Sequence, residues 1–408
     1  MTEPSPNNRE PEYEVTLLEL FFDLAFVFGI SQFSQYLLKH LSWRGAAETL
    51  VMLMTVLAVW SYTSWAATMI RGHNSRTWWM LLAVTFFGLF MNASIPRAFT
   101  TFGWEFVVPL LLIQLGSTVW TIANALDVMN RNHYVRVLLW FLVTTPFWIV
   151  GAAMNPDRRL LWWIVACGVE LIGTWLAHPI PGRRLHSENV AFDADHMLER
   201  CRLFLIIALG ETVLTTGTAI SHASVTLITL LTGTFAFLGT LALWALSFGR
   251  SYRLILQHLE ETCDPIRDSR HAINVLMVLV AGLIAVAVAN QKVIAQPEEK
   301  TSVALSLLLF GGPVYFVLAR GWYHKAVLRV SSRPQLAGSA VLVVLGCAAL
   351  RAPAYVALVL VGIGLLLLVM VDWRYSIDSD AQSRRKKKQA FFAHRKRDRC
   401  GQAREDAK

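Results

Sequence analysis

The chain has 408 residues, of which 55% are hydrophobic and 16% are charged, and its formal net charge is +9. Its mean hydropathy is +0.47. Soluble domains contain about 25% charged residues. The composition therefore excludes an ordinary soluble enzyme or binding domain and predicts a polytopic membrane protein.

Apolar stretches long enough to cross a bilayer recur along the whole chain. Backbone groups in lipid must be hydrogen-bonded internally, which favours helices over other spanning structures. The predicted fold class is an all-α polytopic membrane protein with about 12 transmembrane helices. The predicted spans are Leu17–Tyr36, Thr49–Met69, Trp78–Ile95, Phe106–Ala125, Val137–Ala153, Leu160–Leu176, Leu203–Ile220, Thr226–Leu246, Ala272–Ala289, Val303–Leu318, Leu336–Leu350 and Ala354–Val371.

The first span carries two carboxylates, Glu19 and Asp23. Their i, i+4 spacing places them on one face of a helix. A charged residue at the centre of a membrane helix costs about 2.5–3.5 kcal/mol on insertion scales. We therefore expect Asp23 and Glu19 to bind protons or small cations. The alternative is that they pair with an arginine at the membrane surface and fix helix packing.

An even number of spans puts both termini on one side of the membrane. Most of the 37 lysines and arginines fall on that side, so the positive-inside rule predicts that both termini are cytoplasmic. The predicted organisation is an acidic N-terminus (1–16), a first six-helix half (17–176), a cytoplasmic connector (177–202), a second six-helix half (203–371) and a basic tail (372–408).

Faint self-similarity relates the two halves. It predicts two parallel six-helix repeats, an arrangement of secondary transporters with sites between the halves. Chance likeness is the alternative. The matched pairs are Gly29 with Gly210, Trp65-x5-Arg71 with Trp244-x5-Arg250, and Arg76-x11-Gly88-Leu89 with Arg270-x11-Gly282-Leu283. Gly29 and Gly210 are predicted helix-packing positions.

Glu211 lies eight residues into the seventh predicted span. Spans one and seven both start from the cytoplasmic side, so Glu211 and Asp23 are expected at comparable depth. If the halves are repeats, the two residues would face each other across the central axis. Two carboxylates within reach of each other share a proton at neutral pH. Glu211 is therefore a second predicted ion- or proton-binding residue.

The segment before the seventh span contains His196, Glu199 and Arg200, which share one side of a helix. We expect an ion-pair cluster here that reaches Glu19 and forms an inner gate. Metal binding is the alternative, although the spacing is not that of an HExxH site and no cysteine lies at ligand spacing.

No catalytic, nucleotide-binding or metal-binding motif stands in a suitable context, so neither catalytic residues nor a cofactor are predicted. Glu170 of the sixth span is expected to form interhelical hydrogen bonds, together with Asn92, Gln114, Asn290 and Gln291. The five cysteines are scattered and are interpreted as small apolar fillers or free thiols: Cys167, Cys201, Cys263, Cys347 and Cys400.

Two basic runs, Arg384–Lys388 and Arg395–Arg397, follow the last span. They favour binding to anionic lipid headgroups, or a simple topology anchor. Nucleic-acid binding is not predicted, because no folded reading domain accompanies the runs.

Two segments carry a family resemblance. Leu18–Phe28 (LELFFDLAFVF) resembles the opening signature of the bacterial low temperature requirement protein A family. His196–Glu211 (HMLERCRLFLIIALGE) is similar to its second signature, with Cys201 and Arg202 in place of the family's Phe and Gly. This departure adds charge at the start of the span, where the family's small residue would allow close packing.

The resemblance implies a bacterial inner-membrane protein of a family named for growth in the cold, and it supplies no reaction. The motif residues that it maps onto this chain are Glu19, Asp23, His196, Glu199, Arg200, Gly210 and Glu211.

These observations support three hypotheses. The first is an ion- or proton-coupled transporter or channel-like protein. The second is a membrane scaffold or sensor with structural carboxylates. The third is a membrane enzyme acting on lipid, in which His196 and Glu199 would be the acid/base groups; the chain is more simply read as a protein that is not an enzyme.

Overall fold

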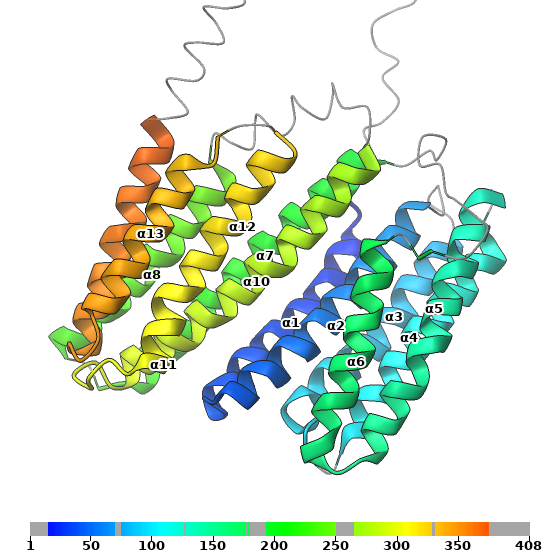
Figure 1. Cartoon of the computed structure of the whole chain (residues 1–408), viewed down its shortest axis with the longest axis horizontal. Helices are drawn as coiled ribbons and strands as arrows, with labels where there is room; N and C mark the ends of the chain where they lie inside the picture. The colour runs from blue at the N-terminus through cyan, green and yellow to red at the C-terminus, as the bar shows by residue number, and fades with distance from the viewer. Residues whose placement is uncertain are drawn as a thin grey trace, which may run out of the picture.

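The structure is a computed structural model that describes residues 15–69, 75–100, 102–125, 128–176, 178–179, 193–224, 226–249, 265–328 and 331–374. Within these ranges the chain is a bundle of helices (Figure 1). In the first half they are α1 (Leu17–Lys39), α2 (Trp43–Met69), α3 (Ser75–Ser94), η1 (Ile95–Arg97), α4 (Gly103–Asn124), α5 (Val128–Ala153) and α6 (Pro156–Trp175). In the second half they are α7 (Ala194–His222), α8 (Leu227–Phe248), α10 (Pro265–Ala295), α11 (Val303–Ser306), η3 (Leu307–Gly311), α12 (Gly312–Ala326), α13 (Arg333–Ala348) and a last helix, Ala354–Arg374.

The predicted all-α membrane fold is confirmed. Each of the twelve predicted spans corresponds to a helix, apart from one or two residues at some ends, and α11, η3 and α12 form one continuous rod. Ten helices of the described chain are long and apolar enough to cross a membrane. The two others are α13, which has 16 residues, and α6, which carries Arg158, Arg159 and Glu170 within its 20 residues.

The helix that contains the seventh predicted span starts before that span. α7 begins at Ala194, nine residues before Leu203, so the end of the 177–202 connector is helical. Asp193 caps this helix, because its carboxylate accepts a hydrogen bond from the backbone N–H of His196 at 3.0 Å. Polar residues can therefore extend the helix beyond its apolar part. Residues 1–14 and 375–408, including both basic runs, lie outside the described residues.

The same order of helix contacts occurs in both halves. α1 packs on α2 and α3, as α7 packs on α8 and α10; α3 packs on α4, as α10 packs on α12. α4 packs on α5, as α12 packs on α13. The halves meet where α1 contacts α7 and α10 (Figure 1). This recurrence supports two parallel repeats.

The glycine pairs chosen from the sequence do not have equivalent surroundings. A Cβ at Gly88 would lie 3.3 Å from the ring of Phe26 on α1, whereas one at Gly282 would lie 2.8 Å from the carbonyl of Gly312 on α12. The two arginines of the Trp-x5-Arg pairs, Arg71 and Arg250, lie outside the described residues. The repeat is therefore supported by helix order and not by these individual residues.

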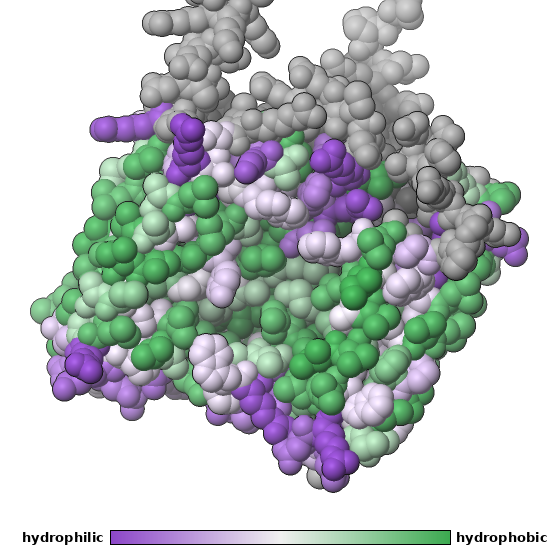
Figure 2. Space-filling model, viewed as in Figure 1, coloured by the Kyte–Doolittle hydropathy of each residue, from purple (hydrophilic) through white to green (hydrophobic). Residues whose placement is uncertain are grey.

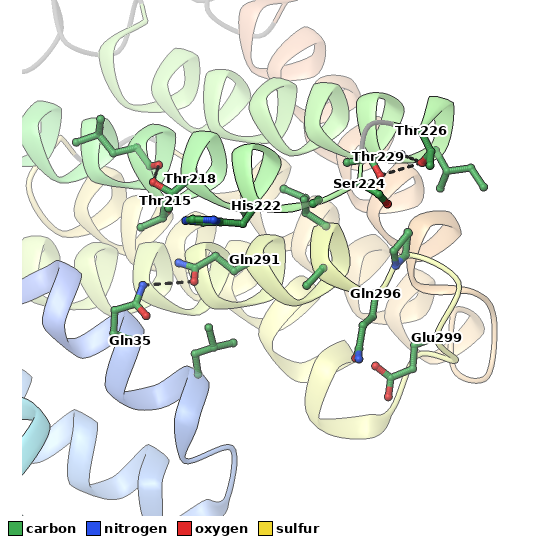
Figure 3. Close-up of a pocket in the computed structure, with 18 of the residues that line it drawn as sticks. Gln35, Thr215, Thr218, His222, Ser224, Thr226, Thr229, Gln291, Gln296 and Glu299 are labelled. Carbon is green, nitrogen blue, oxygen red and sulfur yellow. Dashed lines mark hydrogen bonds between the residues drawn. The ribbon is translucent and has the colours of Figure 1, made fainter.

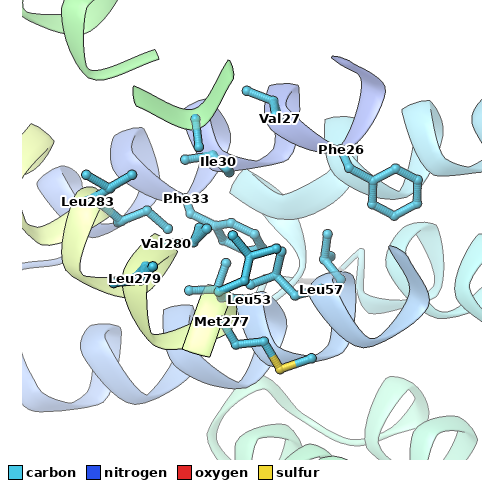
Figure 4. Close-up of a cluster of buried hydrophobic side chains, with 14 of the residues drawn as sticks. Phe26, Val27, Ile30, Phe33, Leu53, Leu57, Met277, Leu279, Val280 and Leu283 are labelled. Atoms are coloured by element: carbon cyan, nitrogen blue, oxygen red, sulfur yellow. The ribbon is translucent and has the colours of Figure 1, made fainter. Parts of the chain in front are cut away.

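The surface has the pattern expected in a membrane. In Figure 2, hydrophilic residues gather along the upper and lower edges of the visible face, and a hydrophobic band lies between them. The core between the halves is also apolar, and Figure 4 shows Ile30, Phe33, Leu53, Val280 and Leu283 of α1, α2 and α10 gathered there. The edge where α1 begins is also the edge where the last helix ends (Figure 1).

At the edge opposite the start of α1, one buried arginine joins the chain after η1 to the end of α5. Arg159 donates to the backbone carbonyls of Ala98 at 2.7 Å, Met154 at 3.1 Å and Gly151 at 3.2 Å, and also to that of Thr100. These carbonyls belong to the chain after η1 and to the end of α5. Arg159 thus supplies donors to helix ends that would otherwise be unsatisfied.

Candidate functional site

The first helix begins at a capping box. The backbone N–H of Glu19 donates to the Thr16 hydroxyl at 3.3 Å, and the backbone N–H of Thr16 donates to Glu19 Oε2 at 2.9 Å. This reciprocal pair satisfies two donors at the helix start. It also fixes the carboxylate of Glu19 at the edge of the bundle, with 8% of its side chain exposed.

Asp23 lies one turn deeper and is fully buried. Its Oδ1 accepts from Arg200 Nη2 at 2.8 Å and from Trp60 Nε1 at 2.7 Å. Its Oδ2 has no hydrogen-bond partner. The carboxylate is thus paired with a cation through only one of its two oxygens.

The Arg200 guanidinium connects the two carboxylates. It is fully buried, its Nη1 lies 3.7 Å from Glu19 Oε1, and its centre lies 5.2 Å from the Phe22 ring centroid and 5.8 Å from that of Trp60. His196 Nε2 lies 3.3 Å from Glu19 Oε2. We refer to Glu19, Asp23, His196 and Arg200 as the ion-pair cluster. It joins α1 of the first half to α7 of the second.

Glu199 does not belong to this cluster. Its carboxylate lies 3.0 Å from Arg202 Nη1 on the same helix, and both side chains are about one-third exposed. Consecutive helix positions point about 100° apart, so the helix that turns Arg200 inward turns Glu199 away. The arrangement of His196 with Glu199 that a lipid-acting enzyme would need is not assembled, because His196 contacts Glu19.

The expected pairing of Asp23 with Glu211 is wrong. α7 begins at Ala194, so Arg200 lies level with Asp23, and Glu211 accepts a hydrogen bond from Ser31 further along α1. Asp23 and Ser31 are eight residues apart, which corresponds to about 12 Å along the helix axis. Glu211 therefore lies deeper in the bundle and does not share a proton with Asp23.

Glu211 lines a cavity of about 1550 Å³ on the other side of the bundle from the ion-pair cluster. We call it the open cavity. It lies between the later parts of α1, α7 and α10, with residues of the following loop at its rim (Figure 3). Gln35 donates to Gln291 across it at 3.5 Å. Its other polar lining residues are Ser31, Thr215, Thr218, His222, Ser224, Thr226, Thr229, Gln296, Glu298 and Glu299.

An apolar layer separates the ion-pair cluster from the open cavity. On α1, Phe26, Val27 and Ile30 lie between Asp23 and the cavity residues and are at most 3% exposed. On α7, Phe204 and Ala208 occupy the corresponding stretch and are fully buried. Water entering the cavity therefore meets an apolar barrier before it reaches the cluster.

The two glycines predicted to allow helix packing differ. A Cβ at Gly29 would lie 2.8 Å from Asn92 Oδ1, and Asn92 Nδ2 donates to the Ala25 carbonyl of α1 at 2.8 Å. A Cβ at Gly210 would meet no atom within 4 Å. The geometry thus fits a packing role for Gly29 and gives none to Gly210.

Sequence reasoning missed several residues of this region. Trp60 donates to Asp23 but looks like any other tryptophan in an apolar span, and the cavity residues Gln35 and His222 carry no motif. Thr16 could have been found, because Thr-x-x-Glu before an apolar run is the signature of a capping box.

Within the described residues, no group of three or more histidine, cysteine, aspartate or glutamate side chains is placed to hold a metal ion. Cys167, Cys201 and Cys347 are free thiols, whereas Cys263 and Cys400 lie outside the described residues. Cys201 is buried in α7, so the departure from the family's Phe at this position is compatible with a packed helix.

Comparison with known proteins agrees with the two signature segments. The family model described as bacterial low temperature requirement A protein matches residues 14–371. A protein of Rhizobium meliloti (strain 1021) named "Uncharacterized protein RA0937" is 29% identical over 368 residues, which cover 88% of each chain. The match spans both halves, the ion-pair cluster and the open cavity, and the chain belongs to the bacterial low temperature requirement A family.

Proposed function

We propose that this protein is an ion-coupled membrane transporter. Glu211 binds a proton or small cation at the inner end of the open cavity, and the ion-pair cluster closes the path on the opposite side. The observation that carries the proposal is that an open polar cavity and a closed charged cluster lie in series along the same two helices, α1 and α7.

The charge of the cavity favours cations. Its lining includes the carboxylates of Glu211, Glu298 and Glu299, and no lysine or arginine is among the described lining residues. Glu299 lies 3.4 Å from Lys292 and is thereby partly neutralised. Glu211 lies furthest from the rim and receives a neutral donor, Ser31, so it is the carboxylate best placed to hold a cation.

Transport requires that the closed side open in turn. Glu19 and Asp23 belong to the first half, whereas His196 and Arg200 belong to the second, so rocking of one half against the other separates them. Asp23 accepts from Arg200 through Oδ1 alone, so this ion pair lacks the second parallel hydrogen bond of a bidentate pair. Asp23 thus acts in the gate, and Glu211 is the binding group.

We further propose a bacterial inner-membrane location with both termini in the cytoplasm, because lysines and arginines are most abundant on that side. The open cavity then faces away from the cytoplasm. The basic tail would bind anionic lipid headgroups.

The test is cation and proton flux into liposomes that hold the purified full-length protein. Wild type should respond to an imposed gradient, and Glu211→Gln should lose the response. Asp23→Asn should lose coupling and show an ungated leak, whereas Glu199→Gln, the matched control, should behave as wild type. Undiminished flux in folded Glu211→Gln protein would contradict the proposal.

A scaffold or sensor role is the second candidate. It is favoured by the pairing of Glu19 and Asp23 with cations across the two halves, which is what a purely structural lock requires. In that case no gradient would drive flux, and Asp23→Asn would lower only stability or expression. The membrane-enzyme hypothesis receives no such support, because His196 and Glu199 face different partners.

A further inference from the structure

A buried carboxylate site lies inside the first half, apart from the ion-pair cluster and the open cavity. Glu170 of α6 is 4% exposed. Its Oε2 accepts from Gln114 Nε2 of α4 at 3.0 Å, and its Oε1 accepts from Thr144 Oγ1 and Trp148 Nε1 of α5 at 2.9 and 2.8 Å. Three donors from two neighbouring helices therefore surround this side chain.

All three donors are neutral. No ion pair to Glu170 occurs within the described residues. The donor Trp148 packs in turn on Trp163, with ring centroids 5.7 Å apart, and both rings are fully buried. An ionised carboxylate without a counter-ion is strongly disfavoured in an apolar interior, so the site must also accommodate the protonated acid.

Gln114 can serve both protonation states. Its side chain is buried, and its Oε1 has no hydrogen-bond partner among the described residues, although its Nε2 donates to Glu170. A half-turn of the amide exchanges these two atoms. In the present orientation the N–H group donates to the ionised carboxylate. In the rotated orientation the amide oxygen accepts a hydrogen bond from the O–H group of the protonated acid.

The hydrogen-bond donors to Glu170 do not titrate, and the titratable groups near it lie on α6 and α2. α4 and α5 face it with Gln114, Thr144 and Trp148, none of which titrates; the neighbouring titratable groups are Cys167 on α6 and Tyr62 on α2.

Hydrogen-bonded side chains lead from the backbone of Glu170 to an edge of the bundle, beginning with Thr174 Oγ1, which donates to the Glu170 carbonyl at 2.9 Å. Thr174, one turn beyond Glu170, lies 2.6 Å from the Tyr62 hydroxyl, which lies 2.8 Å from His178 Nε2. Burial lowers the pKa of His178 to about 3, so this ring is neutral at physiological pH, and its tautomer decides whether Nε2 donates to the Tyr62 hydroxyl or accepts from it. His178 follows the end of α6, at the edge where α1 begins (Figure 1).

We propose that Glu170 is a proton-binding site of the first half, with Gln114 turning from donor to acceptor when the proton arrives. The carboxylate gains one proton from water at the α1 edge and returns it in the reverse step, and no other bond changes. The site is independent of the transport role assigned to Glu211.

The experiment is infrared spectroscopy of the full-length protein in lipid nanodiscs over a pH series, in light and heavy water. The difference between wild type and Glu170→Gln should contain the C=O stretching band of a protonated carboxylic acid. The band should shift in heavy water, disappear at alkaline pH and persist in Glu211→Gln, the matched control.

A second variant, Gln114→Leu, removes the acceptor and keeps Glu170. Its carboxylic acid band should remain and move to higher wavenumber, a result that does not depend on whether Glu170→Gln folds. The proposal is overturned if wild type shows no such band at any pH, or if the band never responds to pH. An unchanged band in Gln114→Leu would overturn the role of the amide.

Discussion

At the residue scale, the fully buried Asp23 and Arg200 compensate each other's charge. Among the described residues, Glu19 is the other carboxylate that pairs with Arg200. Removing one partner of such a pair leaves the other charge uncompensated, which costs more than the pair itself contributes. Exposed pairs such as Glu199 with Arg202 are screened by solvent and matter far less.

Asp23→Asn is therefore expected to lower the free energy of unfolding by about 3–5 kcal/mol, since Arg200 would stay buried beside a neutral amide. Glu199→Gln, the matched control on a partly exposed pair, should cost about 0–1 kcal/mol. Denaturant or thermal unfolding of the purified protein in detergent measures both. Equal losses in the two variants would show that the buried pair has no special structural role.

At the scale of elements, α1 is the centre of the molecule, because it packs on α2 and α3 of its own half and on α7 and α10 of the other. Its contact with α3 is close at Gly29, where Asn92 occupies the space that a side chain would fill. α7 has no such close approach at Gly210, although the sequence suggested that the two glycines correspond.

Gly29→Ala should destabilise the protein by about 1–3 kcal/mol, because the new methyl group would displace Asn92 and its hydrogen bond to Ala25. Gly210→Ala should be neutral or stabilising by up to about 1 kcal/mol, since alanine favours a helix and the space is open. The midpoints of thermal unfolding in detergent compare the two variants. A lower midpoint for Gly210→Ala alone would contradict this account of the packing.

At the scale of the whole molecule, the open cavity and the ion-pair cluster lie toward opposite ends of α1 and α7. Thr218 lines the open cavity and is exposed, whereas Met197 lies near the ion-pair cluster and is fully buried. The proposed orientation places Thr218 on the side away from the cytoplasm.

In a variant without the five native cysteines, Thr218→Cys should react with a membrane-impermeant maleimide added to intact cells. Met197→Cys, the buried control, should not react in the same cells. Labelling of Thr218→Cys only in inside-out vesicles would reverse the proposed orientation, and absence of labelling in either preparation would contradict an open cavity.

The sequence by itself determined the helices, because a bilayer demands apolar stretches of fixed length whatever their neighbours are. It also singled out Glu19, Asp23 and Glu211, because charge within such a stretch is costly and therefore conspicuous, and it singled out His196 and Arg200 as polar residues immediately before one. It did not determine where the helices start: the apolar stretch begins at Leu203, nine residues after α7 begins at Ala194, so the depth expected for Glu211 relative to Asp23 was wrong.

The tertiary structure alone decided the partners. Apolar length does not encode the rotation or the level of one helix against another, so the pairing of Asp23 with Arg200, the donors around Glu170 and the cavity beside Glu211 emerge only when the helices pack. The unremarkable Trp60 and Gln114 have their roles for the same reason: packing brings them to a buried carboxylate that must be satisfied.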